Sequence, residues 1–313
     1  MSGPSRRGFL KASAAGLAAL VTGGFHPNET RGAGAESRRR FQYSKCNETF
    51  RGWPQEKIFR CIARLGYTGV EIAPFTIAND VAHVSARRRA ELRRQAEDAG
   101  IQIVGLHWLL SRTKGLHLTS PDPAVRRKTT GYLCKLAEFC SDLGGSVLVF
   151  GSPKQRNLLP GIGREQGMRY AAEVLRGVLP TLARLDVVLA LEPLSPRTTN
   201  FLTTAAEAAE LVDRVEDRGC KLILDCNAMA SESAPIPQLI RKYRSQLVHF
   251  HANDPNGRGP GMGKLDFVPI FEALRDIRYG GWISVEVFDY SPGCETLARK
   301  SIEYLKKVEA QLG

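Results

Sequence analysis

The chain has 313 residues and carries 44 Lys and Arg against 32 Asp and Glu, a formal net charge of +12 at pH 7. Its seven cysteines are odd in number and include no CxxC pair, which argues against a disulfide framework and against a zinc module. The basic residues are scattered, so solvated helix faces explain the charge better than a nucleic-acid interface does.

The N-terminal segment has the features of an export signal. Residues 5–11 read Ser-Arg-Arg-Gly-Phe-Leu-Lys, a twin-arginine pattern; an apolar run follows at 12–21, and Ala33-Gly34-Ala35 offers small residues for cleavage. The apolar run is far shorter than the roughly 20 residues that span a bilayer. We therefore predict a twin-arginine signal in residues 1–35, export to the periplasm and no membrane span in the mature chain. A basic, disordered N-terminus is the alternative.

From residue 41 onward, short β-branched apolar runs alternate with longer amphipathic segments. Strands are predicted at 41–44, 69–73, 101–106, 146–150, 187–191, 221–224, 247–250 and 283–287. Helical patterns at 55–65, 86–99, 124–143, 165–184 and 204–217 lie between them, and several end at a glycine. Strands that are apolar on both faces and alternate with helices eight times favour a closed parallel sheet. We predict a single α/β domain over residues 36–313, a (β/α)8 TIM barrel of roughly the usual ~250-residue size.

Polar residues at the carboxyl ends of such strands form the active sites of barrels. Glu192 follows the fifth predicted strand, Asp225 the sixth and His251 the seventh, and Glu286 lies in the eighth. Three carboxylates at matching heights would repel one another unless a cation lay between them. Three oxygen donors and one nitrogen suit Mn²⁺, Mg²⁺ or Co²⁺, and they are compatible with Zn²⁺. We predict a divalent-metal site on these four residues, with separate ion pairs as the alternative. Glu71, inside the second strand, either faces this pocket or makes an ion pair within the barrel.

Side chains on neighbouring loops are candidates for substrate binding. His107 and Trp108 follow the third strand and are predicted to form a sugar-facing wall, because binding pockets are commonly lined by aromatic side chains. Packing of Trp108 against the barrel rim is the alternative. Lys154 and Arg156, after the fourth strand, would hold a phosphate or carboxylate at the mouth unless both are solvated. Asn227 is a further candidate contact after the sixth strand.

The order of these motifs resembles the xylose-isomerase-like barrel family of sugar isomerases and epimerases. The resemblance rests on Glu192, Asp225, His251 within His-x-x-Asp, Glu286, and a Gly-Pro-Gly-Met-Gly-Lys-Leu-Asp loop at 259–266, and it covers essentially the whole mature chain. The spacing of the four ligands is similar to that of ketose 3-epimerases of the D-tagatose/D-allulose type. The resemblance implies that the two glutamates act as bases on opposite faces of the carbon next to a carbonyl, while the aspartate and histidine serve as ligands.

One position departs from that pattern. Ketose epimerases of this type usually place a substrate-contacting histidine three residues after the aspartate of strand six, and here that position is Ala228. Asn227 would substitute for it only in part. The resemblance therefore supports the chemistry better than it supports a particular ketohexose.

The leading interpretation is a metal-dependent sugar isomerase or epimerase that abstracts a proton next to a carbonyl through an enediolate. A metal-dependent lyase or dehydratase on a keto-sugar or inositol derivative is the second, because the same enediolate can expel a β-leaving group. An endonuclease-IV-like phosphodiesterase would need a three-metal cluster with more histidines than this chain has. A barrel that only binds carbohydrate would be expected to lack a ligand or a base. A homo-oligomer is compatible with each of these interpretations.

Overall fold

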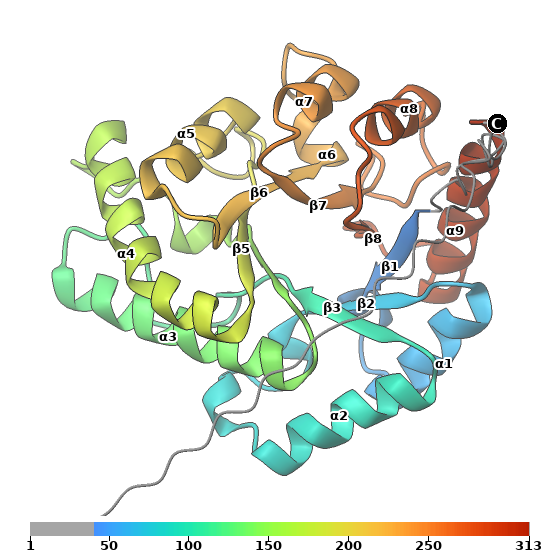
Figure 1. Ribbon diagram of the computed structural model, residues 1–313, viewed down its shortest axis with the longest axis horizontal. Coiled ribbons are helices and arrows are strands. Elements are labelled where there is room, and N and C mark those ends of the chain that lie inside the picture. The colour runs from blue at the N-terminus through green and yellow to red at the C-terminus, as the bar shows by residue number, and fades with distance from the viewer. Residues whose placement is uncertain (1–40, 313) are drawn as a thin grey trace, which may run out of the picture. The chain divides into compact units, whose positions relative to one another are not determined.

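The computed structural model describes residues 41–312, so the signal predicted in residues 1–35 lies outside the described part. Within residues 41–312, the strands form a closed parallel barrel in chain order from β1 to β8, and β8 is hydrogen-bonded back to β1. Helices lie around the outside of these strands (Figure 1). The predicted TIM barrel is thereby confirmed.

The elements follow the predicted alternation closely. The strands are β1 (Gln42–Cys46), β2 (Gly69–Ile72), β3 (Gln102–Leu106), β4 (Val147–Phe150), β5 (Val188–Leu191), β6 (Cys220–Asp225), β7 (Leu247–Ala252) and β8 (Trp282–Val285). The α-helices are α1 (Gln55–Leu65), α2 (Ala86–Asp98), α3 (Pro123–Asp142), α4 (Arg164–Leu185), α5 (Ala205–Val215), α6 (Cys226–Met229), α7 (Ile236–Lys242), α8 (Val268–Asp276) and α9 (Cys294–Gln311). Short 3-10 turns lie at η1 (Asn47–Phe50), η2 (Pro74–Thr76), η3 (Val81–His83) and η4 (Pro153–Gln155).

Local sequence signals fix several helix ends. The side chains of Ser85, Asp122 and Thr204 accept hydrogen bonds from backbone N–H groups in the first turns of α2, α3 and α5. Such caps satisfy N–H groups that have no partner within the helix. Gly66 ends α1 with φ of 95°, a conformation that glycine adopts without steric cost.

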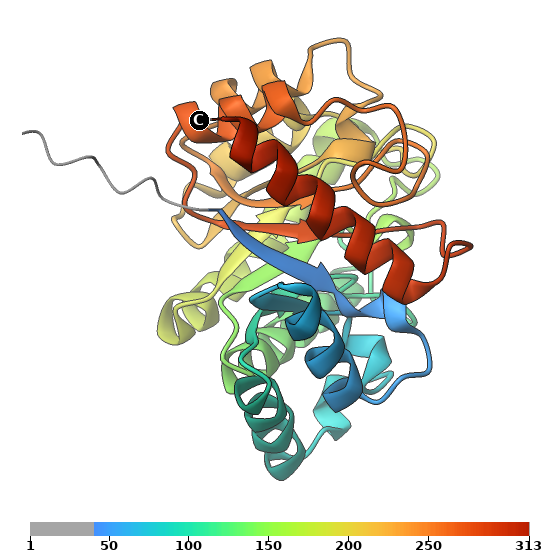
Figure 2. The ribbon, with the colours of Figure 1, turned by 90° about the vertical axis from the view of Figure 1, so that its right-hand side faces the viewer.

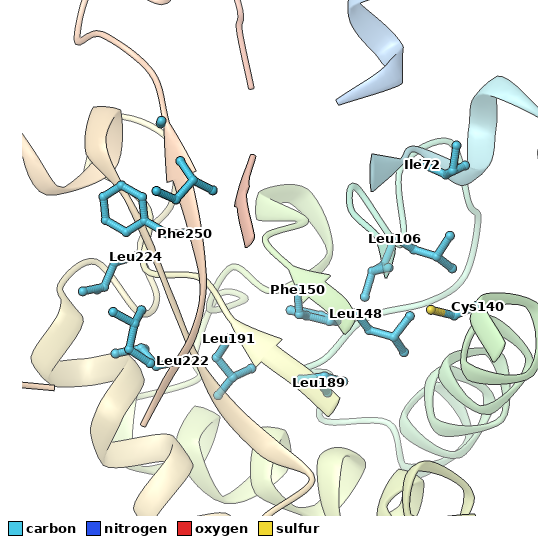
Figure 3. Close-up of a cluster of buried hydrophobic side chains, with 14 of the residues drawn as sticks. Ile72, Leu106, Cys140, Leu148, Phe150, Leu189, Leu191, Leu222, Leu224 and Phe250 are labelled. Atoms are coloured by element: carbon cyan, nitrogen blue, oxygen red, sulfur yellow. The ribbon is translucent and has the colours of Figure 1, made fainter. Parts of the chain in front are cut away.

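The main core lies between the barrel and its helices. Alternate residues of the strands point outward and bury aliphatic and aromatic side chains against the helices, as Leu189, Leu191, Leu222 and Leu224 do in Figure 3. The C-terminal helix α9 runs alongside β1 (Figure 2). Its Glu309 accepts hydrogen bonds from Phe41 N (2.8 Å) and from the Tyr43 hydroxyl (3.0 Å). These two bonds link the last helix to the first strand of the barrel. No helix in the described residues is long and apolar enough to cross a membrane.

The barrel interior is divided between apolar and polar side chains. A small buried cluster of Val149, Ala190 and Ile223 fills one part of it. Glu71, His249 and Ser284 are also fully buried, but they hydrogen-bond to one another: His249 Nε2 lies 2.8 Å from Glu71 Oε2 and 3.2 Å from Ser284 Oγ. A buried polar group is stable only when it is paired in this way.

Candidate metal centre

The four predicted metal ligands converge at the carboxyl ends of the strands. Glu192, Asp225, His251 and Glu286 each offer a ligand atom, and these atoms all lie within 4.8 Å of one another. The barrel register brings them together: Asp225 and His251 are direct partners across β6 and β7, and Ser284, two residues before Glu286, pairs with His251. All four are buried, and Glu192 has the most exposed side chain of the set at 8%.

The imidazole of His251 lies between two groups of carboxylates. Its Nδ1 is 3.0 Å from Glu286 Oε2, 3.7 Å from Glu192 Oε1 and 3.8 Å from Asp225 Oδ2. Its Nε2 lies on the other side, 3.2 Å from Glu71 Oε2. A carboxylate that accepts the second ring N–H of a metal-binding histidine fixes the ring orientation and makes the ligand more basic. Glu71 is therefore the ion-pair partner of this histidine inside the barrel, which settles between the two roles that the sequence left open.

Burial and charge shift the acidity of these groups in opposite directions. Burial, together with the carboxylates of Glu192 and Glu286, raises the pKa of Asp225 to about 7. Burial also acts to raise the pKa of Glu286, but the imidazoles of His251 and His107 outweigh it and lower that pKa. The pKa of His251 is raised well above its usual value, because Glu71 and Glu286 overcome the effect of burial.

The donor set fits a divalent cation. Three buried carboxylates face one imidazole nitrogen, so the four groups carry a net negative charge when the carboxylates are ionised. A cation among these four groups would supply the missing positive charge and would replace the proton on His251 Nδ1. Oxygen-rich donor sets with one imidazole suit Mn²⁺, Mg²⁺ and Co²⁺ and are compatible with Zn²⁺.

Asp225 is held in place by both of its oxygens. Oδ1 accepts a hydrogen bond from Ala228 N at 2.7 Å, and Oδ2 accepts one from Asn253 Nδ2 at 2.6 Å. Asn253 is fully buried and was not singled out from the sequence. It lies two residues after His251, so the period of two along a strand could have placed it on the same side.

Glu286 is bound by donors on the oxygen that does not face His251. Its Oε1 accepts a hydrogen bond from Trp108 Nε1 at 2.6 Å and lies 3.3 Å from His107 Nδ1. His107 Nε2 in turn lies 3.0 Å from Glu48 Oε2, and both side chains are buried. The two atoms do not have hydrogen-bond geometry, so this contact is an ion pair. Burial alone would lower the pKa of His107, but Glu48 and Glu286 raise it to about 10. Glu48, in η1 directly after β1, is thus a further residue of the centre, one to which the sequence alone gave no role.

Two predicted substrate contacts have a different role in the structure. Arg156 is fully buried, and its guanidinium donates hydrogen bonds to the carbonyl oxygens of Glu192 and Leu202. A side chain with no accessible surface cannot hold a phosphate at the mouth, so that prediction was wrong, and Arg156 instead supports the backbone that carries Glu192. His107 is also fully buried, so it contacts Glu286 and Glu48 and does not form a sugar-facing wall.

The remaining candidates keep accessible surface. Trp108 is half-buried, with the edge-on ring of Phe75 beside it (5.9 Å between centroids) and its N–H on Glu286. Lys154 is exposed in η4. Asn227 is half-buried and its side chain donates to the carbonyl oxygen of Asp254 at 3.2 Å. Contact of these three residues with a substrate stays a prediction.

Comparisons with known proteins agree with this fold. Residues 59–308 match the family model described as xylose isomerase-like TIM barrel. The D-psicose 3-epimerase of Enterocloster bolteae is 31% identical over 232 residues, which cover 72% of this chain and 74% of that protein. The 3-dehydro-D-guloside 4-epimerase of Escherichia coli is 24% identical over 238 residues, which cover 73% of this chain and 85% of that protein. A crystal structure of a D-psicose 3-epimerase in the presence of D-fructose has the same fold, with a TM-score of 0.76 and 22% identity over 86% of this chain and 99% of that chain.

Proposed function

The chain belongs to the xylose isomerase-like TIM barrel family, and from this premise we propose that it is a metal-dependent sugar epimerase or isomerase acting at the carbon next to a carbonyl. The observation that carries the proposal is the convergence of Glu192, Asp225, His251 and Glu286 on one buried centre. The relatives named above, epimerases of a ketose and of a dehydro-glycoside, support this reaction class over the others. The signal predicted in residues 1–35 supports a periplasmic location for the enzyme.

The four residues would hold one divalent cation, with His251 bound through Nδ1. When bound, such a cation stabilises the negative charge that develops on the oxygens of an α-hydroxy carbonyl after its proton is removed. Glu71 and Asn253 would keep His251 and Asp225 in the required orientations. Arg156 would do the same for the backbone at Glu192.

The side chains of Glu192 and Glu286 differ in their hydrogen-bond partners. Within residues 41–312, the side chain of Glu192 accepts no hydrogen bond, and its Oε1 lies 3.7 Å from His251 Nδ1. Glu286 Oε1 carries the Trp108 N–H and faces His107. Hydrogen bonds to a carboxylate favour its charged form and weaken it as a base. These contacts favour the charged form of Glu286. We assign the two glutamates to opposite faces of the substrate carbon, where one would take a proton and the other would return one.

Proton exchange at carbon tests this proposal. The purified chain would be loaded with Mn²⁺, Mg²⁺, Co²⁺ or Zn²⁺, its metal content measured, and a panel of ketoses and 3-keto-glycosides incubated with it in D₂O. We expect deuterium at a carbon next to the carbonyl, detected by NMR, and an inverted product. Exchange should fall by roughly 10²–10⁴-fold in Glu192→Gln and in Glu286→Gln, the usual contribution of a general base.

The matched control is Glu295→Gln in the first turn of α9, which removes an exposed carboxylate that is not among the residues of the centre and should leave exchange unchanged. A product of β-elimination in place of an epimer would assign the chain to the lyases. Absence of both metal binding and exchange, with Glu286→Gln binding the same sugars as the wild type, would leave a carbohydrate-binding barrel.

A further inference from the structure

A second hollow lies outside the metal centre. It has a volume of about 740 Å³, within the ~300–1,000 Å³ range of small-molecule sites. It is bounded by the segment from Ala78 to His83, by the loop that follows β3, and by one face of α3. Its lining includes none of the four metal-centre residues and neither His107 nor Trp108.

The lining of this hollow is strongly basic. Among residues 41–312, one carboxylate, that of Asp80, lines the hollow together with four cationic side chains: Arg112, Lys114, Lys128 and Lys135. The Asp80 carboxylate caps η3, since its Oδ1 accepts a hydrogen bond from Ala82 N at 2.9 Å. Like charges gathered in a concave surface repel one another and raise the local positive potential. An anion in the hollow would relieve that repulsion.

One stripe of α3 forms a wall of the hollow. Lys128, Gly131, Tyr132 and Lys135 are spaced at i, i+3, i+4 and i+7, so they share a helix face. Gly131 leaves open space there, because a Cβ built on it would meet no atom within 4 Å. The buried side chain of Leu116 and the ring of Tyr132 add apolar surface beneath the charges, while Asn79 and Thr113 add neutral hydrogen-bonding groups.

We propose that this hollow is a binding site for a saccharide that carries an anionic group, such as the carboxylate of a uronic acid. The cations would hold the anionic group, the neutral polar side chains the hydroxyls, and the apolar surface the face of the sugar ring. The preference for an anion follows from the lining alone, whereas the choice of a saccharide rests on the proposed function.

The position of Arg112 supports a saccharide over an unrelated anion. Its guanidinium lies over the Phe75 ring, 4.6 Å from the centroid, and Phe75 contacts Trp108 edge-on. Trp108 in turn donates to Glu286. Two aromatic side chains, Phe75 and Trp108, therefore connect this side of the hollow with the metal centre, as expected for an accessory sugar site.

Calorimetric titration of the full chain with D-glucuronate, D-glucose and inorganic phosphate tests the proposal. We expect D-glucuronate to bind more tightly than either D-glucose or phosphate. The double variant Lys128→Glu/Lys135→Glu should weaken glucuronate binding by at least about tenfold, about 1.4 kcal/mol. Gly131→Phe, which fills the hollow and leaves its charges intact, should weaken binding to a similar extent.

The matched control is Lys300→Glu/Lys307→Glu on α9, two exposed lysines with the same i, i+7 spacing and the same change in net charge. This control should bind glucuronate as the wild type does. An equal loss in the control would show non-specific attraction to a basic protein and would overturn the proposal. Phosphate binding as tightly as glucuronate, or glucose binding as tightly, would also overturn it. Deuterium exchange at the metal centre should persist in both double variants, so failure here is distinguishable from failure of the proposed reaction.

Discussion

Metal affinity should fall steeply as the pH is lowered from 8 to 6. In the metal-free chain His251 is protonated, because Glu71 and Glu286 outweigh burial and raise its pKa well above the usual value. Its Nδ1 points at the carboxylates, so a cation can bind there only when that proton leaves. Asp225, whose pKa is about 7, carries a second competing proton below neutral pH.

The size of the effect follows from these two groups. Throughout this range His251 releases one proton on binding, which weakens the apparent affinity about tenfold per unit of pH, or about 100-fold in all. Asp225 is mostly ionised at pH 8 and mostly protonated at pH 6, because its pKa of about 7 lies between them. Its protonation weakens binding by roughly another tenfold. We therefore expect Mn²⁺ to bind on the order of 1,000-fold more weakly at pH 6 than at pH 8.

Calorimetry in buffers of different ionisation enthalpy measures both the affinity and the number of protons released. We expect about one proton at pH 8 and close to two at pH 6. In Asp225→Asn the count should stay at about one at both pH values, with weaker binding overall. An affinity that does not change with pH, or a proton count near zero, would refute the assignment of His251 as the group that the cation displaces.

Three other predictions concern different parts of the chain. Gly151→Ala should weaken metal binding by about tenfold or more, because a Cβ there would clash with Glu192 Oε2. Unchanged affinity by the same calorimetry would contradict the fixed position of that carboxylate. Glu48→Gln removes the charge beside the imidazole of His107, which faces Glu286. We expect kcat to fall by about tenfold while metal content stays at the wild-type level. A normal kcat would show that Glu48 contributes to stability alone. Replacement of both Arg6 and Arg7 by lysine should keep the protein in the cytoplasm, and equal periplasmic yield on fractionation would exclude the twin-arginine route.

Much of the fold could be predicted because it depends on local patterns. Apolar runs bounded by glycine and polar residues mark each strand, and the predicted bounds fall within about two residues of the observed ones. The largest differences lie where neighbouring strands decide the boundary. Strand β7 extends to Ala252, because His251 pairs with Asp225 and with Ser284, and β8 ends at Val285, before Glu286. Neither pairing is visible in one segment alone.

The four metal-centre residues could be predicted for a related reason. The roles of the residues that hold them in place could not. A carboxylate or histidine at the end of a buried strand stands out locally, and barrel closure then brings four such ends together. The partners of Arg156 lie 36 and 46 residues away, so nothing local distinguishes this buried guanidinium from the exposed Lys154 beside it. Glu48 follows β1 and His107 follows β3, so these two side chains likewise meet only when the barrel has formed.

The polar environment of the centre is concentrated on one side, which bears on substrate choice. On the β6 side, Ala228 offers only its backbone N–H, and that group is already bound to Asp225. On the β3 side, Trp108 and His107 both face Glu286, and Trp108 keeps accessible surface. A substrate would meet the accessible side chain of Trp108, just after β3 and next to Glu286. Selectivity among sugars should therefore respond to changes at Trp108 and Phe75 more strongly than to the introduction of a histidine at Ala228.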